Sequence, residues 1–274
     1  MSINASQPEQ VSQSADPVEA MTGVPAQKLP RDAANWAGKV SRLHAEARPG
    51  AKGDNVTGRK LMGPVQGFGK MWQKTYTVDV GPSVKPEDAI AAWKADFGSF
   101  WPKGNRFHGA LTGIAPGDVA LLDLSMPGGV RLSTGVMVLY ADDESFTLMT
   151  PQGHMFAGWI TNSAYEKDGT TIVQSQVLMR ANDPMYELGL TFGGHRKEDH
   201  FWHDTLETLA THLGSPGRAH TKSLVVVDKR RQWRKAVNIW HNAAIRTVLQ
   251  MVMSPVTGTA RRLRRRPASG TGGS

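Results

Sequence analysis

Alternating apolar and polar positions in the middle of the chain predict an antiparallel sheet. A first strand is expected at residues 71–80, which are rich in β-branched and aromatic residues. Five more strands are expected downstream, separated by short turn-forming sequences. Connections this short require antiparallel neighbours, so these strands should form a meander. The five ranges are 118–126, 130–140, 145–150, 154–165 and 171–180.

Two stretches with helical periodicity accompany the strands. Proline suits the first turn of a helix and acids suit its positive end, so Pro86, Glu87 and Asp88 predict a helix start. A longer helix should follow Pro184 and end at Gly214. The expected fold class is therefore α+β, with a curved antiparallel sheet around a long C-terminal helix and an extension at each end. The space between such a sheet and helix is a usual place for a ligand pocket.

The first 60 residues differ in composition from the strand-rich region. Residues 1–60 are rich in small and polar residues, so we expect a mostly disordered N-terminal arm. One short amphipathic helix is expected within it, because Trp36, Val40 and Leu43 lie at helical spacing. The folded domain is then expected at 61–213.

Positive charge is concentrated at the end of the chain. The 274 residues carry a formal net charge of +8, yet residues 214–274 hold 13 Lys or Arg and one acid. The preceding residues are therefore mildly acidic. We expect a basic amphipathic helical extension at 214–255 and a disordered polybasic tail at 256–274, which together favour an anionic partner.

The extension has the features of a helix that lies in a membrane interface. Apolar residues of 232–253 recur every three or four positions beside basic ones, and arginines follow. Alternatively, this apolar helix face packs on the folded domain or on a second copy of the chain, or the basic segment is only solvated. Nucleic acid is a less favoured partner, because no aromatic residues interleave with the tail arginines. The expected surface-binding residues are Trp233, Arg234, Trp240, Arg261, Arg262, Arg264, Arg265 and Arg266.

Several classes of protein are excluded by what the sequence lacks. The absence of cysteine excludes disulfide scaffolds, thiolate metal sites and cysteine nucleophiles. We find neither a secretory signal nor an apolar run long enough to span a bilayer. The expected location is the cytoplasm, with peripheral association at the inner membrane face left open.

Three stretches resemble the START-like, helix-grip superfamily, also called SRPBCC. They are GFGKMWQKTY (67–76), LSTGVMVLYADDESFTLMTPQGHMFAGWI (132–160) and RANDPMYELG (180–189), and they are similar to a group of uncharacterised bacterial domains. The resemblance implies a helix-grip fold. The superfamily includes lipid carriers, hormone receptors, polyketide cyclases and oxygenase subunits, so the resemblance selects no single activity.

Methionine and aromatic residues are frequent in the predicted meander. Such side chains form adaptable walls for a lipid, an isoprenoid or a polyketide-like molecule, although a packed core needs apolar residues as well. We therefore expect a protein that binds or carries a hydrophobic small molecule, without a cofactor or a metal. The expected ligand-binding residues are Met126, Val138, Tyr140, Phe146, Met149, Phe156, Trp159 and Met179.

An enzyme of polyketide-cyclase or hydroxylase-partner type is the alternative. It would need an acid and a base in the same cavity. The candidate side chains are His154, Asp123, Tyr140, His108 and Arg106, although the sequence does not show that they converge.

Two other motifs lack the pattern of a metal-binding or phosphate-binding site. Glu198, Asp199, His200 and His203 have neither the spacing nor the order of a zinc-binding helix, and acids at a helix start are explained by its dipole. The glycine-rich run 63–70 ends in Lys followed by Met and precedes a strand, so it is not a phosphate-binding loop.

Overall fold

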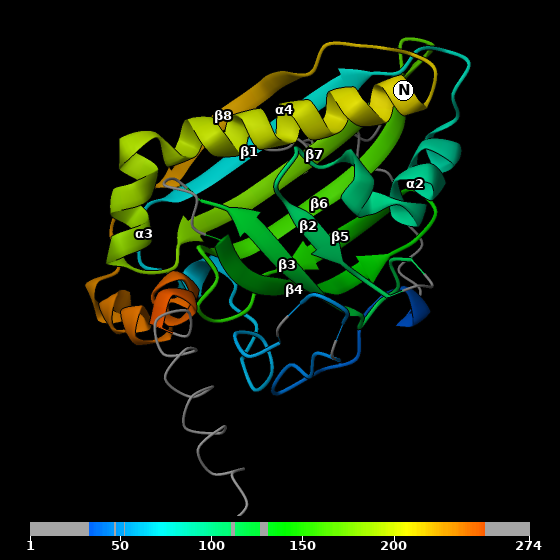
Figure 1. Cartoon of the computed structure of the whole chain (residues 1–274). Coiled ribbons are helices and arrows are strands. Elements are labelled where there is room, and N and C mark those ends of the chain that lie inside the picture. Colours follow the sequence, from blue (N-terminus) through cyan, green and yellow to red (C-terminus); the bar gives the residue numbers. More distant parts are fainter. Residues whose placement is uncertain (1–32, 47, 52, 111–112, 127–130, 250–274) are drawn as a thin grey trace, which may run out of the picture. The chain divides into compact units, whose positions relative to one another are not determined.

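The computed structural model describes residues 33–249 except 47, 52, 111–112 and 127–130 (Figure 1). These residues belong to one compact unit, apart from Ala33. The described part of the chain contains no helix that is both long enough and apolar enough to cross a membrane.

The sheet contains eight strands within the described residues. They are β1 (Met71–Asp79), β2 (Arg106–His108), β3 (Val119–Ser125), β4 (Arg131–Ala141), β5 (Ser145–Met149), β6 (Phe156–Lys167), β7 (Thr170–Ala181) and β8 (His220–Asp228). Their order in space is β2-β3-β4-β5-β6-β7-β1-β8, and all neighbours are antiparallel. The predicted first strand and meander are confirmed.

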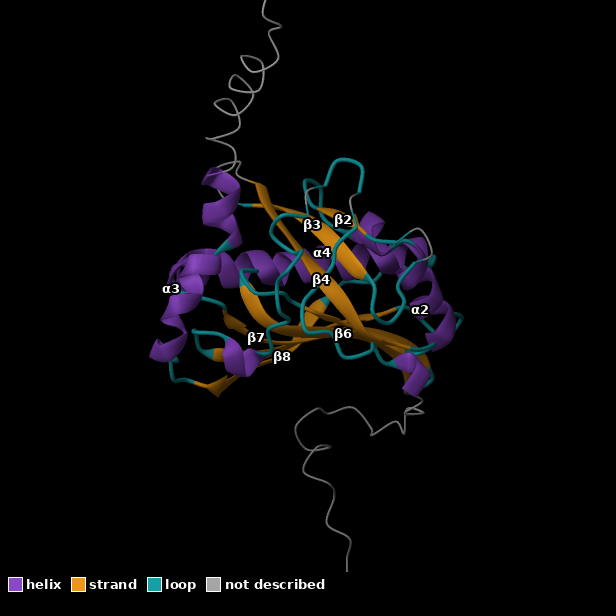
Figure 2. Cartoon of the chain, turned by 90° about the horizontal axis from the view of Figure 1, so that it is seen from below, coloured by secondary structure: helices purple, strands orange, loops and turns teal. Residues whose placement is uncertain are grey.

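Helices α2 (Pro86–Ala95) and α4 (His195–His212) pack on one face of the sheet. The other helix is α3 (Pro184–Gly189), and the short helical segments are η1 (Ala33–Asn35), η2 (Pro64–Gln66), η3 (Phe97–Phe100), η5 (Leu190–Gly194) and η6 (Trp233–His241). Figure 2 shows the strands curving around α4. The expected α+β helix-grip fold is confirmed.

Local signals place both ends of the α3–α4 region. Asp183 caps α3, because its side chain accepts hydrogen bonds from the backbone N–H groups of Met185 and Tyr186. Gly214 follows α4 with a φ of 78°, a left-handed conformation that favours glycine. The predicted helix boundaries are therefore confirmed, although the structure divides the helix near residue 192.

The inner face of the sheet, which is the face toward the helices, forms the main core. Val136 and Val138 of β4 pack in one cluster with Trp93 of α2 and with Leu206 and Leu209 of α4. Alternation along β4 directs the intervening side chains to the opposite, outer face.

The outer face is covered by a segment expected to be part of the disordered arm. Leu43 and Val56 are buried against Leu121 and Met137 of β3 and β4. The expected helix over 36–43 is wrong, because the segment bonds to the sheet instead of to itself. One such bond runs from the backbone N–H of Ala37 to the carbonyl of Leu139 over 2.9 Å. The packed part of the chain thus starts before residue 61.

The C-terminal extension is also different from the expected helix. Residues 220–228 form β8, which adds an eighth strand beside β1 because this β-branched run can pair along its free edge. Beyond it, η6 has 3₁₀ geometry, and residues 243–249 form an α-helical segment. The expected tail at 256–274 lies outside the described residues.

Candidate functional site

A cavity of about 380 Å³ lies between the inner face of the sheet and α4. Its walls come from both layers and from the α3–α4 junction. The apolar wall includes Leu122, Leu124, Val136, Leu148, Ile160 and Val177 of the sheet and Leu190, Phe201 and Trp202 of the helical layer. This volume falls in the range of small-molecule sites in proteins.

The structure brings four of the eight predicted ligand-binding residues to this cavity. They are Met126, Phe156, Trp159 and Met179. Met179 is almost fully buried, and it also belongs to the main core. These positions come from the end of β3, from β6 and from β7, so strands distant in the sequence supply one wall.

Two of the other predicted residues are buried in the packed core instead. Val138 and Phe146 face inward as predicted, but helix α2 and η3 cover that part of the sheet. Phe146 lies 5.6 Å from Trp93 and 5.3 Å from Phe97 between ring centroids, in edge-to-face contacts. The aromatic side chains therefore occupy the space between Phe146 and helix α2.

The remaining two predicted residues lie on the outer face. A register shift between Val138 and Tyr140 precedes the pairing of Tyr140 with Thr147, and the Tyr140 ring lies 4.8 Å from the ring of Trp36. Met149 packs over Gly63, where an added Cβ would lie 3.5 Å from its Cε atom. Neither residue lines the cavity.

The junction between α3 and α4 forms part of the cavity wall and was missed in the sequence. Gly193 has a φ of 103°, and Phe192 departs from helical geometry with φ −94° and ψ 43°. The break turns the chain between the helices and leaves Phe192 80 % exposed. The adjacent glycines 193 and 194 were the available signal, since a glycine pair weakens a helix and permits positive φ.

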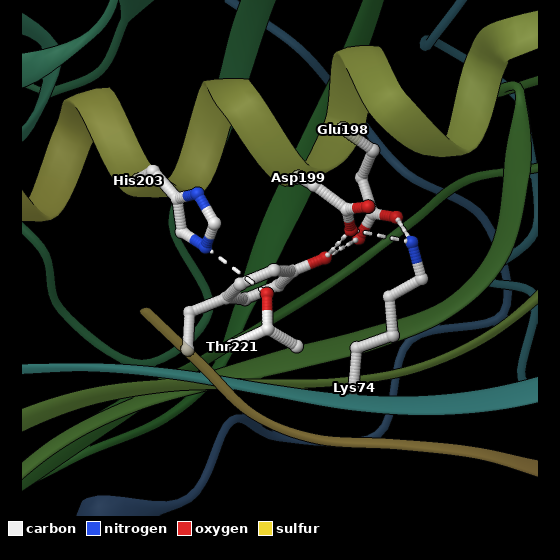
Figure 3. Close-up of polar contacts among 6 residues, drawn as sticks. Lys74, Glu198, Asp199, His203 and Thr221 are labelled. Atoms are coloured by element: carbon white, nitrogen blue, oxygen red, sulfur yellow. Dashed lines mark hydrogen bonds and ion pairs between the residues drawn. The ribbon is translucent and has the colours of Figure 1, made fainter. Parts of the chain in front are cut away.

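A buried polar cluster adjoins the cavity beneath α4 (Figure 3). The side chain of Lys74 is fully buried, and its Nζ donates to Glu198 Oε2 over 2.5 Å and to Asp199 Oδ1 over 2.8 Å. Of these residues, Glu198 also lines the cavity. The hydroxyl of Tyr76 lies 2.7 Å from Asp199 Oδ1 and 3.1 Å from Glu198 Oε1.

Burial and hydrogen bonding act differently on the two carboxyl groups of this cluster. Tyr76 has one hydroxyl hydrogen, and its shorter contact is with Asp199 rather than with Glu198. Burial raises the pKa of Glu198 to about 7, although Lys74 opposes that shift. Burial also acts on Asp199, but hydrogen bonds from Lys74 and Tyr76 outweigh it and lower its pKa.

The nearby histidines do not form a metal site with these acids. His203 Nε2 lies 3.0 Å from the Thr221 hydroxyl oxygen, and His200 is exposed. Within the described ranges, no three His, Asp or Glu side chains are grouped to hold a metal ion. The His195 ring lies 4.5 Å from the Trp72 ring in a tilted arrangement, and burial together with Lys74 lowers its pKa to about 4.

Of the predicted acid–base candidates, only His154 lines the cavity. Asp123 instead bonds to the Ser133 hydroxyl and to His108 Nε2, at 2.6 and 3.2 Å. Tyr140 bonds to Asp142 on the outer face. Arg106 of β2 pairs in register with Asp123. The predicted group therefore does not converge on one site.

The predicted surface-binding residues that are described lie near α3. Trp233 is 73 % exposed and Trp240 is 81 % exposed, and Arg234 is exposed beside them. Two asparagines of this segment anchor it: Asn238 Nδ2 donates to the Asn182 carbonyl and Asn242 Nδ2 donates to Asp183 Oδ2. The five predicted tail arginines, Arg261, Arg262, Arg264, Arg265 and Arg266, lie outside the described residues.

Comparison with known proteins yields structural similarity without sequence similarity. No protein-family model and no curated protein matches this chain. The di-domain ARO/CYC StfQ from the steffimycin biosynthetic pathway is similar at 8 % identity and a TM-score of 0.42, over 53 % of this chain and 51 % of that one. Protein Ms6760 from Mycobacterium smegmatis is similar at 14 % identity and a TM-score of 0.37, over 52 % of this chain and 90 % of that one. Ara h 8.0201 is similar at 13 % identity and a TM-score of 0.36, over 52 % of this chain and 99 % of that one.

These values are too low to carry a functional argument. The chain spans about half the length of StfQ, the di-domain protein. The resemblance to the helix-grip superfamily is confirmed as a resemblance of fold, because the antiparallel sheet curves around a long helix. Fold by itself does not assign an activity.

Proposed function

We propose that this protein binds a hydrophobic small molecule in the cavity between the sheet and α4. One observation carries the proposal: a space of about 380 Å³ with mainly apolar walls stays open inside an otherwise packed layer. Transfer of an apolar molecule from water into such a space is favourable in proportion to the area buried. A lipid, an isoprenoid or a polyketide-like molecule has the required character.

The proposal is tested by filling the cavity from its wall. Val177 lines the cavity, and Leu178 on the same strand does not, so Val177→Phe and Leu178→Phe form a matched pair. Native mass spectrometry of protein purified from its own host should show one bound apolar molecule in the wild type and in Leu178→Phe. Val177→Phe should be empty. A wild type that stays empty after incubation with a lipid library would contradict the proposal.

A second function is favoured by the exposed aromatic residues of η6: docking on an anionic membrane surface. Trp233, Val237 and Trp240 are 62–81 % exposed at spacings of four and three residues. Tryptophan is favoured at membrane interfaces, and basic residues attract anionic lipid. Residues 229–249 contain no acid, and their basic side chains are Lys229, Arg230, Arg231, Arg234, Lys235 and Arg246.

Vesicle co-sedimentation tests this docking. Wild type should bind vesicles of phosphatidylcholine and phosphatidylglycerol better than vesicles of phosphatidylcholine alone, and salt should weaken the binding. The double variant Trp233→Ala/Trp240→Ala should lose most of it. Val65→Ala, which changes a 67 % exposed side chain on η2, should not. If Trp233→Ala/Trp240→Ala binds vesicles as well as Val65→Ala does, η6 is not the docking surface. If the wild type prefers DNA to vesicles, the nucleic-acid alternative is favoured.

An acid–base enzyme in the same cavity is the remaining alternative, and Glu198 is the observation that favours it. A buried carboxyl group with a pKa near neutrality can exchange a proton with a bound molecule. Incubation of an extracted ligand with wild type and with Glu198→Gln separates the two functions. A change in ligand mass or structure with wild type only would indicate turnover, whereas an unchanged ligand supports binding.

A further inference from the structure

His154 is a polar side chain in the mainly apolar wall of the cavity. The residue is 5 % exposed. Its Nδ1 atom accepts a hydrogen bond from the backbone N–H of Phe156 over 3.0 Å. The Phe156 carbonyl oxygen also lies 3.3 Å from Nδ1, but the contact with the N–H is the shorter one. In a neutral imidazole one nitrogen accepts and the other carries the hydrogen, so the shorter contact assigns the hydrogen to Nε2. Burial lowers the pKa of His154 to about 4, which keeps the ring neutral at physiological pH.

The loop that carries His154 is held on both sides. The Asn182 side-chain amide donates to the His154 carbonyl over 2.9 Å, and the Gly153 carbonyl accepts from the Ala243 N–H over 2.9 Å. Gly153 has a φ of 94°, and an added Cβ there would lie 2.1 Å from the His241 carbonyl oxygen. The imidazole is thus fixed before any ligand arrives, and preorganised groups bind with less loss of entropy.

The Nε2–H group has no acceptor among the residues that the structure describes. Hydrogen bonds of this ring are present only at Nδ1, with the backbone of Phe156. Of the other polar groups in the wall, the Thr150 hydroxyl bonds to Gly158, whereas the indole Nε1–H of Trp101 is a second donor without a partner among the described residues. A donor that borders an apolar space gains a hydrogen bond when a ligand oxygen occupies that space.

We propose that the cavity selects an apolar molecule that presents a neutral hydrogen-bond acceptor, a ketone, ester, ether or hydroxyl oxygen, to His154 Nε2. This inference rests on the proposed function, since it names the polar group by which the same cavity recognises its ligand. A neutral ring offers one directed donor without a charge. The preference should therefore be for the position of an oxygen atom in an otherwise apolar ligand.

Two naphthalene probes of equal size isolate this hydrogen bond. 2-Acetylnaphthalene has a carbonyl oxygen where 2-isopropylnaphthalene has a methyl group. Trp101, Trp159 and Trp202 line the cavity, so quenching of tryptophan fluorescence reports binding of either probe. Dissociation constants are measured for wild type, for His154→Phe and for the control variant His200→Phe. His200 is exposed on α4 and does not line the cavity.

The expected result is a change in the ratio of the two affinities. His154→Phe should weaken the ketone about five- to tenfold, the usual size of one hydrogen bond, and change the hydrocarbon less than about twofold. His200→Phe should change neither. An unchanged ratio in His154→Phe would overturn the inference and leave the proposed function intact. Failure of both probes to bind wild type would count against the proposed function itself.

A second measurement does not depend on the folding of a variant. Nitrogen-15 NMR of the wild-type imidazoles distinguishes the two neutral tautomers. The His154 ring should carry its hydrogen on Nε2 at pH 7, and the Nε2 signal should shift when 2-acetylnaphthalene is added. A hydrogen on Nδ1, or no shift under saturating ketone, would overturn the inference.

Discussion

Helix α2 and the α3–α4 junction lie toward opposite ends of the sheet (Figure 1). The space between the sheet and the helices is filled near α2 and open near the α3–α4 junction. At the filled end, Phe97 contacts four other aromatic rings at centroid distances of 5.0–6.2 Å. At the open end, Leu190, Phe192 and Gly193 border a cavity. The same inner face of the same sheet therefore supports two different interiors.

The difference arises from the helices rather than from the strands. Helix α2 and the following η3 pack Trp93, Phe97 and Phe100 against the sheet, and these large rings fill the space on its inner face. The α3–α4 junction instead contributes glycines and turns Phe192 outward. A strand decides which face a side chain occupies, and the element opposite decides whether that face is core or cavity wall.

The largest expected effect is at the filled end. Phe97→Ala should lower the free energy of unfolding by about 3–5 kcal/mol, because it removes a buried ring and leaves a cavity. Urea denaturation followed by circular dichroism measures this. The control is Phe192→Ala at the open end, which should change stability by less than about 0.5 kcal/mol because that ring is exposed. Equal losses in both variants would contradict the distinction between the two ends.

A smaller effect is expected at the polar cluster beside the open end. Lys74→Met should cost about 3 kcal/mol, because it leaves Glu198 and Asp199 without their buried cation. The double variant Lys74→Met/Asp199→Asn should recover part of the loss in the same denaturation experiment. If the single variant is as stable as wild type, the cluster does not stabilise the wall of the cavity.

The pH dependence of stability gives the smallest effect. Between pH 4.5 and about 7, Glu198 holds in the folded state a proton that the unfolded chain has lost. Its contribution to stability therefore falls as pH rises through this window. The titratable groups that face Glu198 or lie near it are Lys74, Tyr76, Asp199 and His195. A glutamine side chain does not titrate, so Glu198→Gln lacks this pH-dependent contribution to stability.

The stability of Glu198→Gln relative to wild type should thus rise by about 2 kcal/mol between pH 5 and pH 7.5. Urea midpoints of both proteins at pH 5 and pH 7.5 measure the change. A difference between the two proteins that does not vary with pH would show that Glu198 titrates normally.

The main parts of the fold could be predicted from local patterns. Alternation identified β1 and the five strands of the meander, and Pro86 and Pro184 marked two helix starts. The edges of the fold could not be predicted from local patterns. β8 lies within the expected helical extension, and Leu43 and Val56 lie in the expected disordered arm, because their partners are distant strands.

The site was predicted only in part, for the same reason. Met126, Phe156, Trp159 and Met179 lie around the cavity, whereas Phe146 is covered by α2. Glu198 looked like an ordinary acid at a helix start. Its place in the cavity wall and its contact with Lys74 depend on how α4 crosses β1, over a separation of more than 120 residues.

The sequence by itself determined the order of the elements, the face on which most strand side chains lie and the excess of positive charge at the C-terminal end. These properties follow from short-range periodicity and from composition, which need no knowledge of distant partners. Only the tertiary structure decided which apolar residues enclose a space, which imidazole lies in its wall and which acid is buried beside a lysine. Burial and pairing are set by elements far apart in the chain, and those contacts shift a residue's pKa and hydrogen bonding away from what its identity alone implies.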